Sequence, residues 1–270
     1  MPPAIRSAAA GWQGSSLSEA KRHYGIRIAD HAALQKHYRT IPFGGKPLRY
    51  PLDGRWGMWR RHGMRRGDIE RRLAVYRPGE PRSSIRQRGD HELNKDGAPP
   101  AKLRPASVLV PLVEREPGLT VLLTQRTTNL PSHGGQISFP GGRQQPEDVD
   151  VIATALRETE EEVGLTADRI TVIGSLDTYI TGTGFLVTPI VGMVTPPFEL
   201  RPDPGEVADV FEVPLAFFLD PANHELRSAV WQGRERHFYV MPFEDRYIWG
   251  ATAGMLKNLY DVLVDAAVQV

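Results

Sequence analysis

Five of the six residues from Arg157 to Glu162 carry a charge, in the order Arg-Glu-Thr-Glu-Glu-Glu. Glu158, Glu161 and Glu162 are spaced as i, i+3 and i+4, so a helix would project them from one face. Carboxylates gathered in this way repel one another unless a cation neutralises them. Their hard oxygen ligands favour Mg²⁺ or Mn²⁺, ions that commonly bridge phosphate oxygens. The spacing indicates a divalent-metal site, although a solvated acidic face in which Arg157 pairs locally explains the glutamates equally well.

A helix must present these carboxylates, and the pattern predicts one over residues 149–163. Asp148 or Asp150 can cap its first turn, and Gly164 ends it in the manner of a left-handed terminal residue. Before it comes Ser138-Phe139-Pro140-Gly141-Gly142, whose glycines would let the backbone approach a metal-bound phosphate. This order of a glycine-containing loop and an acidic helix favours the metal site over the solvated face.

The rest of the chain supplies strands to hold that loop and helix. Runs of β-branched residues and leucine predict a hairpin from Ala106–Val113 and Leu119–Thr124. Further strands are expected at residues 170–176, 186–194, 210–213 and 237–241. A final helix is predicted over Trp249–Ala267, with a core-packing stripe formed by Trp249, Ala253, Leu256, Tyr260, Leu263 and Ala267. Mixed strands with few helices predict an α/β sandwich.

In this context the chain resembles the Nudix hydrolases, whose signature is Gly, five residues, Glu, seven residues and Arg-Glu-U-x-Glu-Glu-x-Gly-U, with U aliphatic. The matching residues are Gly142, Arg157, Glu158, Glu161, Glu162, Gly164 and Leu165. The departures are Asp148 for the first Glu, one inserted residue before Arg157, and Thr159 for an aliphatic residue. The resemblance implies an α/β/α sandwich with a mixed β-sheet, in which Glu158, Glu161 and Glu162 bind Mg²⁺ or Mn²⁺ and Arg157 orients them.

The stretch from Leu122 to Gly142 resembles the motif of the coenzyme A pyrophosphatase branch, Leu-Leu-Thr-x-Arg-Ser/Ala, three residues, Arg, three residues, Gly, three residues, Phe-Pro-Gly-Gly. The residues in register are Leu122, Leu123, Thr124, Arg126, Gly135, Phe139, Pro140, Gly141 and Gly142. Thr127 replaces Ser or Ala, and Pro131 replaces the second Arg, removing a cation that could meet a substrate phosphate. The resemblance implies that coenzyme A or a derivative is hydrolysed by metal-activated water to 4′-phosphopantetheine and adenosine 3′,5′-bisphosphate.

Other residues are candidates for parts of this reaction. Glu161, Glu162 or Glu206 could accept the proton of the attacking water, although Glu206 equally fits a solvated loop. Arg126, Gly141 and Gly142 are candidate phosphate contacts, and an exposed strand end is the simpler role for Arg126. His133 is a candidate substrate contact in a segment that favours a turn residue. Thr181–Gly184 either admits substrate to the backbone or forms an inter-strand turn.

Charge divides the chain into two unlike parts. Residues 1–104 hold 22 Lys and Arg against 9 Asp and Glu, whereas the remainder holds 11 against 23. Residues 1–64 have no sustained helical or strand period and predict an irregular basic extension; the alternative is a nucleic-acid-binding arm. Translation from Met64 is a further hypothesis, because Arg65–Tyr76 predicts a new amphipathic helix. Residues 65–104 then comprise this helix and a Pro/Gly-rich linker, and residues 105–270 the Nudix domain.

Composition excludes several classes of protein. The chain has no cysteine, so disulfide scaffolds and thiolate chemistry are excluded. It contains no P-loop, no His-Glu-x-x-His and no Gly-x-Ser-x-Gly. Without a signal peptide or an apolar run of about 20 residues, it is expected to be cytoplasmic, with a small-molecule substrate and no membrane partner. The alternatives are a Nudix enzyme for a dinucleotide, ADP-ribose or 5′-triphosphate RNA, and a nucleic-acid-binding protein that uses the basic leader.

Overall fold

The computed structural model describes residues 38–43, 46–51, 64–76, 78, 88–94, 100–116, 118–130, 133–231 and 233–264. Within the basic leader, β1 (Tyr38–Phe43) and β2 (Lys46–Pro51) pair antiparallel as a separate two-stranded sheet. The sequence predicts no strand in this part, so the hairpin differs from expectation. Its backbone pairs without the hydrophobic alternation by which strands are recognised.

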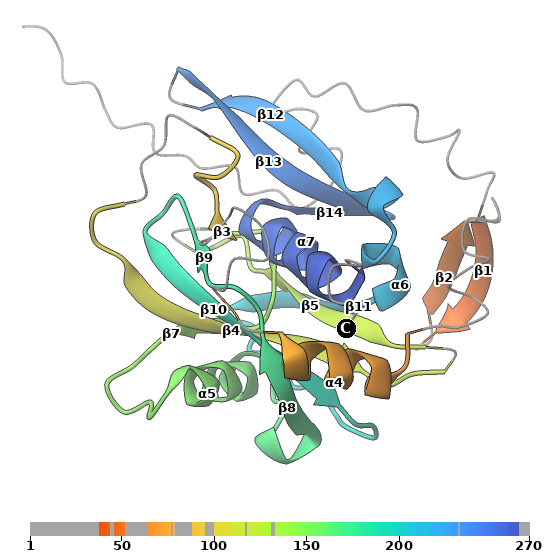
Figure 1. Cartoon of the computed structure of the whole chain (residues 1–270). Helices are drawn as coiled ribbons and strands as arrows, with labels where there is room; N and C mark the ends of the chain where they lie inside the picture. The colour runs from red at the N-terminus through yellow and green to blue at the C-terminus, as the bar shows by residue number, and fades with distance from the viewer. Residues whose placement is uncertain are drawn as a thin grey trace, which may run out of the picture.

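A mixed sheet of nine strands forms the centre of the protein (Figure 1). Its main path runs in the order β11 (Val207–Pro214), β5 (Thr120–Arg126), β4 (Arg104–Val113), β10 (Phe185–Val194), β9 (Tyr179–Ile180) and β3 (Arg88–Gly89). Three strands pair off this path: β6 (Ile137–Ser138) with β5, β7 (Gly141–Arg143) with β4, and β8 (Ile170–Ser175) with β10. Strands β4 and β10 are parallel, as are β3 and β9.

Helices cover both faces of this sheet. Helix α5 (Val151–Val163) and helix α7 (Gly250–Val264) lie on opposite faces (Figure 1). Helix α4 (Arg66–Val75) belongs to the layer of α7, because its Ile69 and Leu73 share a buried cluster with Leu256. Alternation along β4 explains these layers, because Leu109 shares a buried cluster with Ala155 of α5, whereas Val110 shares one with Leu256 of α7. The expected α/β/α sandwich with a mixed sheet is confirmed.

A second, three-stranded sheet lies beside α7 and contains β12 (Glu225–Trp231), β13 (Arg234–Phe243) and β14 (Arg246–Trp249). The remaining elements are the 3-10 turns η2 (Ala167–Arg169) and η3 (Pro221–Asn223) and the short helix α6 (Leu215–Phe218). None of the helices in the described part of the chain combines the length and apolar character that crossing a membrane requires.

Most predicted elements correspond to observed ones. The hairpin matches β4 and β5, and the four further strands match β8, β10, β11 and β13. The final helix starts at Gly250 because Trp249 still belongs to β14, and residues 265–267 lie outside the described residues. Ala253, Leu256 and Leu263 are fully buried, so the predicted role of the stripe in core packing is confirmed for these residues.

The segment before the sheet packs more closely than its composition suggests. Helix α4 is confirmed, with Ile69 and Leu73 buried against the core. Beyond it, in the expected linker, Arg88 of β3 donates from Nη2 to Asp261 Oδ2 of α7 at 2.9 Å. Asn94 donates from Nδ2 to the carbonyl oxygen of His237 in β13 at 3.0 Å. The described part of this segment is therefore joined to the fold, and the domain boundaries stay a prediction.

Candidate active site

Helix α5 has defined ends that fix its acidic residues in space. Asp150 is the N-cap, and its Oδ1 accepts a hydrogen bond from the Ala153 backbone N–H at 2.8 Å. Gly164 ends the helix with a positive φ of 71°, a left-handed conformation that glycine adopts without strain. Of the two capping residues considered from sequence, Asp150 is thus the cap. Asp148 has a different role.

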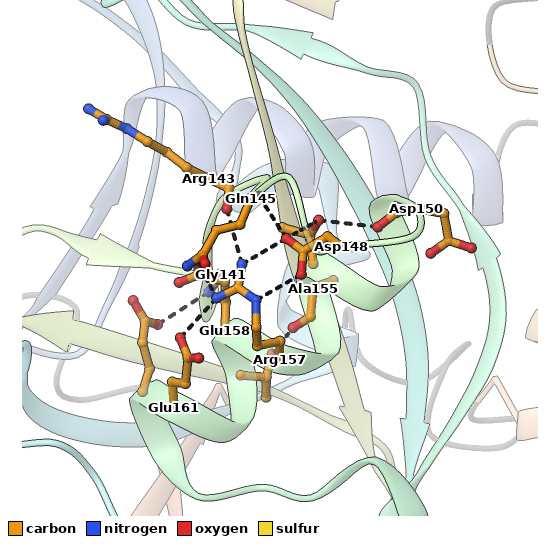
Figure 2. A network of polar contacts seen from close by, with 12 residues as sticks. Gly141, Arg143, Gln145, Asp148, Asp150, Ala155, Arg157, Glu158 and Glu161 are labelled. Carbon is orange, nitrogen blue, oxygen red and sulfur yellow. Dashed lines mark hydrogen bonds and ion pairs between the residues drawn. The ribbon is translucent and has the colours of Figure 1, made fainter.

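Arg157 is the centre of a polar network on α5 (Figure 2). Its Nε and Nη2 donate to the two carboxylate oxygens of Asp148, both at 2.8 Å. Its Nη1 donates to Glu158 Oε1 and to Glu161 Oε2, both at 2.9 Å. Nη2 also donates to the carbonyl oxygen of Arg143 at 3.2 Å. One guanidinium group therefore ties the helix to the loop before it and holds two of the predicted metal ligands.

Asp148 supplies the second half of this network. Its side chain is only 4% exposed and also accepts hydrogen bonds from the Gln145 backbone N–H at 2.8 Å and from Thr154 Oγ1 at 3.0 Å. Hydrogen bonding to Arg157, and then to Gln145, holds the pKa of the Asp148 carboxyl well below its usual range. The Nudix signature has Glu at this position. In this chain the shorter Asp reaches the arginine in a two-oxygen contact.

Two glycines of β7 make room for the carboxylates of α5. A Cβ on Gly142 would lie 2.4 Å from Glu158 Oε2, so only glycine admits Glu158 in its observed position. Gly141, with φ of 147°, donates its backbone N–H to Glu162 Oε2 at 3.2 Å. A Cβ on Gly141 would lie 2.4 Å from the Ser107 carbonyl oxygen on β4. The glycine pair therefore lets a strand backbone lie directly against the acidic helix.

Glu162 is the most enclosed of the predicted ligands, with a side chain 4% exposed. Its Oε1 lies 3.4 Å from Nη1 of Arg126, and Nη2 of Arg126 lies 3.7 Å from Oε2 of Glu206. The backbone carbonyl of Glu206 accepts from the Thr127 N–H at 2.9 Å, which keeps Glu206 beside β5. Burial raises the pKa of Glu162 to about 7, against the opposing effects of Arg126 and the Gly141 N–H.

The structure brings together most of the residues predicted for the site. They are Arg126, Gly141, Gly142, Arg157, Glu158, Glu161, Glu162 and Glu206. Glu161 is the most exposed of these carboxylates, at 58%, and is held through Arg157. The role of Asp148 is the one that sequence reasoning missed; its place in the signature was the available signal.

Two of the predicted site features, His133 and Thr181–Gly184, lie apart from this cluster, and Pro131 lies outside the described residues. His133 is exposed in a turn with φ of 59°, and its Nδ1 lies 2.9 Å from Gln136 Oε1. Gly184 donates its N–H to the Thr181 carbonyl at 3.0 Å, so Thr181–Gly184 forms the inter-strand turn that was one of its two predicted roles.

The donor chemistry of the cluster suits a hard divalent cation. Burial raises the pKa of Glu158, as it does for Glu162. Arg157 opposes the rise at Glu158, whereas the nearby Glu161 and Glu206 add to it. A cation among these oxygens would favour their charged forms. Within the described residues, no three acidic or histidine side chains are already arranged around one point as metal ligands. The carboxylate oxygens of the glutamates are the type of ligand that Mg²⁺ or Mn²⁺ prefers. In the structure, Glu158 and Glu161 accept hydrogen bonds from Arg157.

Comparison with known proteins agrees with the fold and the acidic helix. The NUDIX domain family model matches residues 103–234. A relative from Photorhabdus laumondii, named uncharacterized Nudix hydrolase NudL, is 41% identical over 165 residues, covering 60% of this chain and 88% of the relative. A relative of the same name from Shigella flexneri serotype 5b is 41% identical over 161 residues, covering 59% of this chain and 83% of the relative.

A solved Nudix hydrolase from M. smegmatis, RenU, aligns with a TM-score of 0.38 and 23% identity, over 45% of this chain and 77% of that one. An α/β/α sandwich with a glycine pair against an Arg-Glu-x-x-Glu-Glu helix defines a hydrolase of the Nudix type. With relatives 41% identical over most of their length, the chain belongs to the Nudix hydrolase family.

Proposed function

We propose that the protein hydrolyses the diphosphate bond of coenzyme A, or of a coenzyme A derivative, to 4′-phosphopantetheine and adenosine 3′,5′-bisphosphate. The observation that carries the proposal is the contact between the two motifs. Arg126, from the coenzyme A-type motif on β5, lies 3.4 Å from Glu162, from the Nudix signature on α5. A substrate phosphate held near Glu162 would therefore also lie near the residues that resemble the coenzyme A branch.

Glu158, Glu161 and Glu162 are the proposed ligands of Mg²⁺ or Mn²⁺. An ion held by these residues would supply positive charge to stabilise the diphosphate and would make a water at the site more acidic. Arg157 is a positioning residue in this proposal, because it orients Glu158 and Glu161 and is itself fixed by Asp148.

The proton of the attacking water needs an acceptor near neutral pH. Glu162 is the most enclosed of Glu161, Glu162 and Glu206, with a side chain 4% exposed, so a proton that it accepts there is shielded from bulk water. Glu206 is 49% exposed and lies beside Arg126, so it can take the proton onward to solvent. These three carboxylates remain the proposed proton acceptors, with Glu162 placed first.

Substrate contacts follow from the same arrangement. Arg126 is the proposed phosphate contact and would exchange part of its pairing with Glu162 and Glu206 for substrate oxygens. Gly141 and Gly142 are proposed to let the diphosphate approach the strand backbone. His133 is proposed as an outer contact, since its exposed side chain can leave Gln136 at little cost.

A second candidate function is hydrolysis of another nucleoside diphosphate derivative, such as a dinucleotide, ADP-ribose or 5′-triphosphate RNA. It is favoured by Pro131, which stands where the coenzyme A motif has its second arginine. In either case we propose a cytoplasmic enzyme with a small-molecule substrate and no membrane partner. Nucleic-acid binding by the basic leader is the alternative of another class, and its affinity would fall steeply with salt.

The test is product analysis by mass spectrometry after incubation of the full chain with coenzyme A, ADP-ribose, a dinucleotide and 5′-triphosphate RNA, each with Mg²⁺ or Mn²⁺. The proposal expects 4′-phosphopantetheine and adenosine 3′,5′-bisphosphate in equal amounts, and faster turnover of coenzyme A than of the other compounds. Turnover of another compound with coenzyme A left intact would support the second candidate and end the first.

A further inference from the structure

Two arginines share one aromatic ring where strands β4 and β10 begin, close to the acidic helix. The guanidinium carbon of Arg104 lies 4.0 Å from the centroid of the Phe185 ring, and that of Arg143 lies 5.4 Å from it. The register of the paired strands brings both arginines to this ring. Phe185 of β10 is directly opposite Arg104 of β4, and Arg143 of β7 is opposite Ala106, two residues further along β4.

This pair carries uncompensated positive charge. Both arginines are exposed, and neither forms an ion pair with a carboxylate of the described residues. The ring face attracts both guanidinium groups and keeps them together, but it does not neutralise them. Two like charges held on one ring favour an anion that can contact both. A guanidinium offers the planar N–H groups that suit a phosphate.

The pair lies beside the proposed catalytic centre. Arg143 directly follows Gly141 and Gly142, and its carbonyl oxygen accepts from Nη2 of Arg157 at 3.2 Å. Figure 2 shows its side chain leading away from Arg157, Glu158 and Glu161. A ligand with its diphosphate at the acidic helix could thus place a further phosphate on the arginine pair.

Arg104 is held by the turn that contains Thr183, and Asp90 holds that turn in place. Nη2 of Arg104 donates to the Thr183 carbonyl at 2.8 Å. The turn that contains Thr183 is held by Asp90, which accepts from the Gly182 N–H at 2.6 Å and from the Tyr179 hydroxyl at 2.7 Å. Arg104 is therefore oriented before any ligand binds, which lowers the entropic cost of binding.

We propose that Arg104 and Arg143 form a subsite for a phosphomonoester carried by the diphosphate substrate. For coenzyme A this group is the 3′-phosphate of its adenosine half. The inference rests on the proposed function for the identity of the substrate, but the subsite itself selects by charge. It distinguishes two diphosphates that differ only in a terminal phosphate.

Binding without turnover tests the subsite directly. We would measure the affinity of the full chain for adenosine 3′,5′-bisphosphate and for AMP by calorimetry, with no metal added. The wild-type protein is expected to bind the bisphosphate about 10-fold more tightly than AMP. Arg104→Gln and Arg143→Gln should each reduce this preference several-fold, and the double variant should abolish it. Arg234→Gln, at an exposed arginine of β13, is the matched control and should keep it.

Hydrolysis then separates the subsite from the proposed function. With coenzyme A as substrate, the double variant should raise KM about 10-fold with little change in kcat, and with 3′-dephospho-coenzyme A it should change neither. If coenzyme A is not hydrolysed but the variants remove the preference for bisphosphate, the subsite stands and the proposed function falls. Equal wild-type affinity for the two nucleotides, or a preference kept by the folded double variant, would overturn the subsite.

Discussion

Gly142 and Glu158 lie so close together that a single methyl group cannot be placed between them. The nearest Glu158 oxygen would be 2.4 Å from a Cβ at position 142, whereas the two atoms nearest a Cβ at Gly141 are backbone atoms of Ser107 and Val108 in β4. The two neighbouring glycines therefore have different roles. Gly142 makes space for a flexible side chain, and Gly141 makes space for a strand.

This difference predicts opposite outcomes for two alanine variants. Gly142→Ala should displace Glu158 and lower turnover roughly 10- to 100-fold, with a loss of less than about 1 kcal/mol in the free energy of unfolding. Gly141→Ala should destabilise the fold by about 3 kcal/mol, because the added methyl meets the Ser107 carbonyl and the φ of 147° disfavours alanine. Denaturant unfolding and initial rates measure both; equal stability losses would contradict this division of roles.

Loss of charge at Glu162 should remove activity without removing the fold. Glu162→Gln keeps the hydrogen bond from the Gly141 N–H possible, yet it removes a proposed metal ligand and proton acceptor. We expect turnover to fall roughly 100-fold or more. Glu160→Gln, on the exposed side of the same helix, should leave turnover unchanged. Equal turnover of these two variants would contradict the proposed site.

Divalent ions should stabilise the protein through the same carboxylates. At a concentration about 100 times its Kd, Mg²⁺ or Mn²⁺ would add about 2.7 kcal/mol to the free energy of unfolding and raise Tm. Glu158→Gln and Glu162→Gln should lose this increase, whereas Glu160→Gln should retain it. Thermal scans with EDTA and with each ion make the comparison. A Tm that does not respond to either ion would count against the metal site.

A second carboxylate group, remote from α5, predicts a pH dependence of stability. Burial raises the pKa of Glu92 from 4.5 to about 6, although Arg88 and the Gly89 N–H oppose the shift and Asp177 and Asp261 support it. The folded state thus holds the Glu92 proton more tightly than the unfolded state. The contribution of Glu92 to the free energy of unfolding falls by at most about 2 kcal/mol as pH rises from about 4.5 to about 6. Above that pH it stays constant.

Glu92→Gln removes this titration. Relative to the wild-type protein, the variant should gain stability between pH 4.5 and pH 7, since the cost of the buried charge is absent. Urea unfolding at the two pH values measures the change. A difference between variant and wild type that is the same at both pH values would contradict the raised pKa of Glu92.

Local signals account for the parts of the fold that the sequence predicted. The acidic helix has a capping Asp150 and a terminal Gly164, and the strands matched by β4 and β10 are continuous apolar runs. The proximity of Arg157, Glu158, Glu161 and Glu162 was predictable for the same reason, since they lie within one and a half turns of α5.

Contacts between distant residues account for what the sequence left out. Arg88 appeared to lie in a linker because its partner Asp261 is 173 residues away. Strand β12 has no apolar alternation, and both Leu226 and Val230 are exposed on it, so its residues resemble a surface loop. The shared contacts of Arg104 and Arg143 with Phe185 depend on the parallel pairing of β4 with β10, which no local pattern specifies.

The family match over residues 103–234 leaves out two helices that cover one face of the sheet. One covering layer of the sheet is built by α4, before the match, and by α7, after it. Trimming the chain to the matched span would strip that layer and expose apolar side chains such as Val110 and Met193, which are fully buried in the intact protein. We expect such a fragment to aggregate, and we expect a well-folded version of the chain to need residues from before Arg66 through Val264.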